Sequence, residues 1–70
     1  MNYSKIHTFW GSDEYQDRRA EVEFNKDRYT VHMYKNNKLV ESRLMVSKGV
    51  VHSETYAENA AENFVMGIIQ

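Results

Sequence analysis

Apolar and polar positions alternate on both sides of a central pair of asparagines in residues 29–44. Asn36-Asn37 is typical of a two-residue hairpin loop, because asparagine tolerates the positive φ that a type I′ turn needs at both positions. Counting outward from this loop puts the apolar side chains mainly on one face, since strand side chains alternate with period two. The pairs expected from this loop are Tyr34–Leu39, Met33–Val40, Val31–Ser42 and Tyr29–Leu44.

A third strand precedes this hairpin. Ala20, Val22 and Phe24 alternate with charged residues, and the polar stretch 25–28 separates them from the hairpin. A short loop there places Phe24 opposite Tyr29, so that the two apolar faces coincide. The sequence therefore predicts an antiparallel sheet over residues 18–46.

A helix is predicted over residues 53–69. Its apolar residues recur every four positions and make one stripe. Ser53 can cap its first turn, and Thr55 with Glu58 offers an alternative start as a capping box. The resulting fold class is α+β, with a three-stranded antiparallel sheet and one C-terminal helix packed on one face (βββα). The stripe consists of Tyr56, Ala57, Ala60, Ala61, Phe64, Val65, Ile68 and Ile69.

The N-terminal residues 1–17 are predicted to form an arm or a fourth strand, because side chains alternate from Ile6 to Trp10 before Gly11 interrupts the pattern. Residues 1–70 are expected to form a single small domain. A domain of this size buries only about 60% of its unfolded surface, which leaves a marginal core. We therefore expect a homo-oligomer, in the form of a dimer. The candidate contacts between copies are Phe9, Trp10, Ile68 and Ile69.

Composition excludes several classes of protein. The chain has no cysteine, which is compatible with a reducing compartment, and it has neither an apolar run of about 18 residues nor a basic-then-apolar leader. We expect a cytoplasmic protein of the source or host cell, without membrane contact. No cysteine nucleophile, glycine-rich phosphate loop or metal-ligand spacing is present. The sequence therefore predicts no enzyme, metal or cofactor.

Charge is spread unevenly along the chain. Residues 18–46 carry seven Lys or Arg against four Asp or Glu, although the net charge of the whole chain is −1. A basic sheet suggests a nucleic-acid-binding module as one alternative. Glu21, Glu23 and Glu41 interrupt the predicted open face, so we favour contact with an unidentified protein partner. The candidate partner-binding residues are Arg19, His32, Tyr34, Leu39 and Arg43.

One group of charges on that face suggests more specific chemistry. The expected register puts Glu21, His32 and Glu41 in one row across three strands. Two carboxylates beside one imidazole favour its charged form. The favoured interpretation of this row is an ordinary solvated cross-strand charge pair, and the alternative is a pH-sensitive contact or a weak metal site.

Two segments carry a resemblance. Tyr34-Lys-Asn-Asn-Lys-Leu-Val-Glu41 and Tyr56-Ala-Glu-Asn-Ala-Ala-Glu-Asn-Phe-Val-Met-Gly67 resemble small uncharacterised proteins of marine phages and metagenomes. The resemblance implies a stand-alone, phage-like accessory protein of unknown function, and it brings no functional residues with it.

Overall fold

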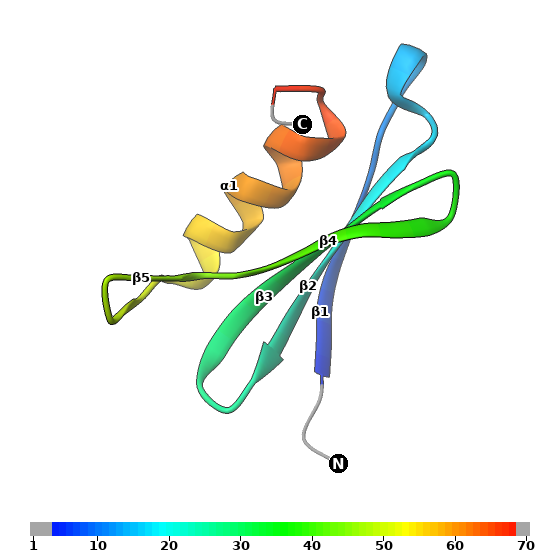
Figure 1. Cartoon of the computed structure of the whole chain (residues 1–70). Coiled ribbons are helices and arrows are strands. Elements are labelled where there is room, and N and C mark those ends of the chain that lie inside the picture. The colour runs from blue at the N-terminus through cyan, green and yellow to red at the C-terminus, as the bar shows by residue number, and fades with distance from the viewer. Residues whose placement is uncertain (1–3, 69–70) are drawn as a thin grey trace.

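The computed structural model describes residues 4–68 and confirms the α+β class. Four strands form an antiparallel sheet in the order β1-β2-β3-β4, and one helix, α1, lies on one side of it (Figure 1). The predicted fourth strand is therefore present. The elements are β1 (Ser4–Trp10), the 3-10 helix η1 (Asp13–Tyr15), β2 (Arg18–Asn25), β3 (Arg28–Lys35), β4 (Lys38–Leu44), β5 (Val46–Ser47), β6 (Val50–Val51) and α1 (Glu54–Val65).

Two-residue turns set the register of the central strands. Asn36 and Asn37 have φ values of 54° and 64°, as the type I′ loop requires. Lys26 and Asp27 do the same between β2 and β3, with φ values of 53° and 66°. Phe24 consequently pairs with Tyr29, which confirms the predicted β2–β3 register.

The predicted β3–β4 register is wrong beyond its first pairs. Tyr34 pairs with Leu39 as expected, but a bulge follows and Met33 pairs with Glu41. The extra residue, Val40, shifts all later pairs by one. Each later side chain of β4 therefore lies on the face opposite to the one predicted for it. Arg43 therefore lies on the helix side of the sheet, opposite Val31.

The N-terminal strand β1 pairs with β2 and has a bulge between Lys5 and His7. Phe9 pairs with Ala20, so it lies on the helix side and packs against the core of its own domain. Trp10 pairs with Arg19 and lies on the opposite, open face.

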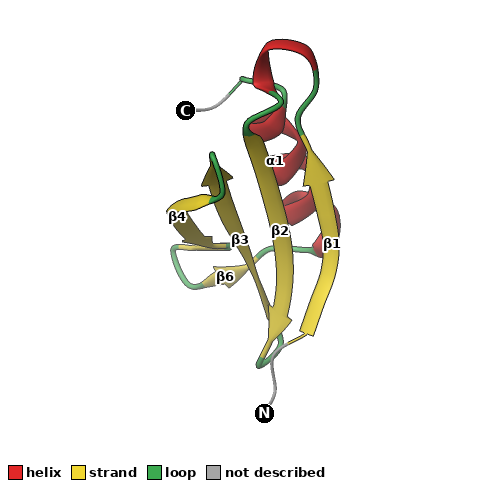
Figure 2. Ribbon diagram, turned by 90° about the vertical axis from the view of Figure 1, so that its right-hand side faces the viewer, coloured by secondary structure: helices red, strands yellow, loops and turns green. Residues whose placement is uncertain are grey.

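The core lies between α1 and the sheet. The helix packs on β1, β2 and β3, and Figure 2 shows β4 well to the side of it. Ala57 and Ala61 are fully buried, and their small side chains allow the helix to approach the sheet closely. The buried apolar residues are Ala20, Val22, Val31, Met33, Met45, Ala57, Ala61, Phe64 and Val65.

The helix begins as predicted and ends early. The Ser53 hydroxyl accepts a hydrogen bond from the Tyr56 backbone N–H at 3.2 Å, which confirms Ser53 as the N-cap. The chain leaves the helix after Val65 because Gly67, with φ of 82°, completes a Schellman motif. Ile68 thus lies beyond the helix and is 62% exposed, whereas Ile69 falls outside the described residues.

A second, two-stranded sheet was not predicted. Strands β5 and β6 form a small hairpin whose turn residues, Lys48 and Gly49, have φ values of 51° and 80°. The signal in the sequence was Lys48-Gly49 between Val46-Ser47 and Val50-Val51, because a two-residue turn that contains glycine between short valine-containing segments is a hairpin pattern.

Candidate functional site

A row of four side chains crosses the open face of the sheet. Trp10, Arg19, Tyr34 and Leu39 lie directly opposite one another on β1, β2, β3 and β4. Residues paired in this way share one face, and α1 covers the other face. We call these four residues the open-face row.

Arg19 is held in place at the centre of the open-face row. Its guanidinium lies 4.1 Å from the centroid of the Tyr34 ring and 5.8 Å from that of Trp10, in cation–π geometry. Nη1 donates to the Asn37 side-chain oxygen at 3.1 Å, and Nε lies 3.4 Å from a Glu21 carboxylate oxygen. These contacts fix the guanidinium between the two rings.

The ends of the row remain accessible. Trp10 is 68% exposed and Leu39 is 54% exposed. Large apolar side chains that are exposed together on one face mark interaction sites more often than isolated ones do. The row therefore combines an ordered centre with two apolar side chains that a partner can cover.

A hollow of about 330 Å³ lies beside the row, at the end of the sheet that carries the Asn36-Asn37 turn. The Asn36 backbone N–H donates to the Asp17 carbonyl oxygen at 2.8 Å, which ties this turn to the loop before β2. The hollow adds amide and carboxylate groups to the apolar row. It is lined by Trp10, Gln16, Asp17, Arg18, Arg19, Asn36 and Asn37.

The same end of the sheet is cationic on its other side. Arg18, Lys35 and Lys38 lie opposite one another across three strands. Arg18 is buried and donates to the Phe64 carbonyl oxygen at 2.8 Å, while Lys38 is exposed. Like charges at directly opposed positions cost free energy in a sheet. Because Arg18 is held in the core, Lys38 carries the exposed positive charge of this row, on the side of the sheet opposite the open-face row.

The structure brings together part of the predicted partner-binding set. Arg19, Tyr34 and Leu39 belong to the open-face row, and His32 lies in the next row of the same face. Arg43 does not share this face, because the β4 bulge turns it to the helix side. There its Nε donates to a Glu41 carboxylate oxygen at 2.8 Å.

The predicted row of Glu21, His32 and Glu41 is wrong for the same reason. His32 pairs with Glu21 on β2 but with Ser42 on β4. Its Nδ1 lies 2.7 Å from the Ser42 hydroxyl oxygen, and its Nε2 contacts a carboxylate oxygen of Glu23. With both ring nitrogens in these contacts, His32 serves as a cross-strand link between β2 and β4.

A histidine cluster that sequence reasoning missed connects β1 to α1. His7 Nε2 lies 2.9 Å from a Glu54 carboxylate oxygen and 2.7 Å from one of Glu58. One imidazole and two carboxylates are a donor set that could hold a divalent cation. The same contacts also link the edge strand to the helix without a cation. The signal was the i, i+4 spacing of the two glutamates together with His7 two residues before Phe9.

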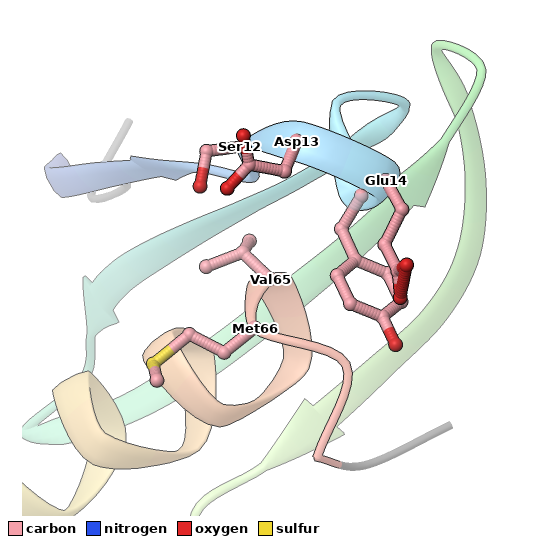
Figure 3. A pocket seen from close by; sticks show the side chains of 6 residues that line it. Ser12, Asp13, Glu14, Val65 and Met66 are labelled. Carbon is pink, nitrogen blue, oxygen red and sulfur yellow. The ribbon is translucent and has the colours of Figure 1, made fainter.

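Another hollow, of about 380 Å³, lies between η1 and the end of α1 (Figure 3). Ser12, Asp13 and Glu14 lie across it from Val65 and Met66. The backbone packs closely at this junction, since a Cβ on Gly11 would lie 3.1 Å from the Val65 carbonyl oxygen. We interpret this hollow as part of the packing interface between the η1 loop and the end of α1.

Comparisons of the chain with protein-family models, with curated proteins and with solved structures found no match. The resemblance to small phage proteins stays a prediction. Within residues 4–68, no helix has the length and apolar character needed to span a membrane.

Proposed function

We propose that the chain is a small binding protein whose open-face row contacts a larger protein partner in the cytoplasm of the source or host cell. The observation that carries this proposal is the alignment of Trp10, Arg19, Tyr34 and Leu39 on the face opposite α1. Trp, Tyr and Arg are the residues most enriched among interface hot spots. The contacts that hold the Arg19 guanidinium between the two rings lower the entropy lost on binding.

The surroundings of the row indicate the chemistry of the partner. Trp10 and Leu39 are exposed apolar groups that suit an apolar centre. Lys35 and Lys38 flank the adjoining turn on the helix side of the sheet. They suit carboxylates on the part of a partner that extends past this end of the sheet, since interfaces pair opposite charges at their rims. The proposed partner is therefore a folded protein with an apolar patch and with Asp or Glu on the part that extends past the Asn36-Asn37 turn.

This proposal is tested by affinity capture from a lysate of the source or host cell, with the Trp10→Ala variant beside the unaltered chain. Because Trp10 is 68% exposed, we expect the variant to keep its fold, which circular dichroism checks. Loss of a hot-spot side chain should reduce the amount of the captured protein by about tenfold or more.

The matched control is Val50→Ala, which removes exposed apolar surface from β6, where the residue is 59% exposed. Capture should survive this change. Equal capture by the Trp10→Ala variant and the unaltered chain would contradict the proposed surface.

Nucleic-acid binding remains the second candidate function. The specific observation in its favour is that Trp10 and Tyr34 flank Arg19 on an open antiparallel sheet, because exposed aromatic rings on such a sheet can stack on bases. Glu21 and Glu23 on the same face oppose phosphate. The capture experiment separates the two functions, since recovery that nuclease abolishes and that falls steeply with salt indicates nucleic acid.

A further inference from the structure

Strand β4 is an exposed edge of the sheet. Six of its seven residues are exposed, and Glu41 is half-buried. Leu39, Val40 and Leu44 on this strand are each about half exposed. An open edge with apolar side chains is a template for pairing with another strand.

One hydrogen bond shows which residues of β4 point their backbone N–H and C=O groups toward the free edge. The Met45 N–H donates to the Tyr29 carbonyl oxygen at 2.9 Å, which fixes the phase of the β3–β4 ladder. Hydrogen-bonded and non-hydrogen-bonded positions alternate along an antiparallel strand. Leu44 and Ser42 therefore occupy non-hydrogen-bonded positions opposite β3. Their N–H and C=O groups face the free edge, where another strand can pair with them.

We propose that a second copy of this chain pairs with β4 in antiparallel orientation, about a two-fold axis at Ser42. This axis places Glu41 of each copy opposite Arg43 of the other. It also places Val40 opposite Leu44, so an apolar pair lies on each side of the charged pairs. The strand is thus complementary to itself in both charge and hydrophobicity.

The charged pairs fall where side chains approach most closely. Glu41 and Arg43 occupy hydrogen-bonded positions toward β3, so they take non-hydrogen-bonded positions across the new seam, which bring side chains nearest. Within one copy, Arg43 Nη2 and Nε both lie 2.8 Å from the same Glu41 oxygen. Pairing extends this contact into a network of four alternating charges.

Neighbouring registers lack this complementarity. Only alternate residues of β4 point their backbone groups to the free edge, so the two-fold axis must pass through a residue and cannot lie between two residues. An axis at Glu41 places that carboxylate opposite itself, and an axis at Arg43 places that guanidinium opposite itself. Like charges directly opposed are unfavourable, so charge selects the register centred at Ser42.

Uncovered surface surrounds the proposed seam. On the helix side of β4, a groove of about 320 Å³ separates the strand from α1, and Arg43 and Tyr56 border it. Tyr56 is 48% exposed. The proposed dimer uses β4 and does not depend on the function proposed for the open-face row.

Sedimentation velocity across a wide concentration range tests the proposal with two single charge reversals. Short strand pairs bury little area, so we expect a weak dimer in fast exchange. Glu41→Arg and Arg43→Glu each put like charges opposite one another, and each should weaken dimerisation by about tenfold or more. Arg28→Glu, an exposed charge reversal at the start of β3, is the control and should dimerise normally.

An equimolar mixture of the Glu41→Arg and Arg43→Glu variants gives the sharpest result. Each reversed charge then faces its opposite in the other copy, so the mixture should form a heterodimer at concentrations where each variant alone is mainly monomeric. Mixing that fails to restore association, or a dimer that both variants retain, would overturn the proposal. A chain that is monomeric at every concentration would overturn it as well.

Amide hydrogen exchange of the unaltered chain tests the same seam without any substitution. The Ser42 and Leu44 amides should exchange at least several-fold more slowly at high protein concentration, whereas the Glu41 and Arg43 amides, already bonded to β3, should change little. Protection at β1 in place of β4 would overturn the assignment of the seam.

Discussion

At the scale of single residues, Gly67 ends the helix and lies against the side chain of Tyr15 in η1. It has φ of 82°, and the N–H groups of Gly67 and Ile68 donate to Phe64 and Asn63 carbonyl oxygens at 3.1 and 2.8 Å. A Cβ at this position would lie 2.2 Å from Cζ of Tyr15. The residue therefore has two constraints, one from its backbone and one from its neighbour.

Gly49 provides a matched comparison, because it has φ of 80° and no heavy atom within 4 Å of an added Cβ. Gly49→Ala should lower the free energy of unfolding by about 1 kcal/mol through backbone strain alone. Gly67→Ala should lower it by about 2 kcal/mol or more, since Tyr15 must also move. Urea denaturation measures both, and equal losses would show that the Tyr15 contact is unimportant.

At the scale of elements, the sequence predicted the position of the Asn36-Asn37 turn, but it did not predict the bulge in β4. Asn36-Asn37 fixed the hairpin because both residues tolerate positive φ. The bulge at Val40 adds one residue to a strand whose alternation looks regular, so a count from the turn cannot detect it. The predicted helix ran to residue 69, because its apolar stripe continues through Ile68 and Ile69, whereas Gly67 completes the C-terminal cap and ends the helix at Val65.

The start of α1 gives a direct test at this scale. Ser53→Ala should lower the free energy of unfolding by about 1 kcal/mol, because the Tyr56 N–H loses its acceptor. Thr55→Ala, which removes the alternative capping residue, should change stability by less than about 0.5 kcal/mol. Thermal and urea unfolding give both values. A larger loss from Thr55→Ala would place the cap two residues later.

At the scale of the whole molecule, the sheet has one covered face, one open face and an exposed edge. The sequence located Arg19, Tyr34 and Leu39 on the open face, because all three lie within the reliable part of the register. It could not align Trp10 with them, since that depends on pairing between β1 and β2 across a polar loop. It misplaced Arg43 through the bulge. Long-range pairing, more than local propensity, therefore determines the candidate surface.

The most direct test of the open-face row is photo-crosslinking in the source or host cell, with benzoylphenylalanine replacing Trp10. This position is 68% exposed and lies on β1, away from the proposed β4 seam. The matched control places the same group at Met66, which is 55% exposed on another side. We predict a discrete adduct with a larger protein from position 10 that is absent from position 66. Equal labelling from both positions, or none from position 10, would contradict a binding role for this face.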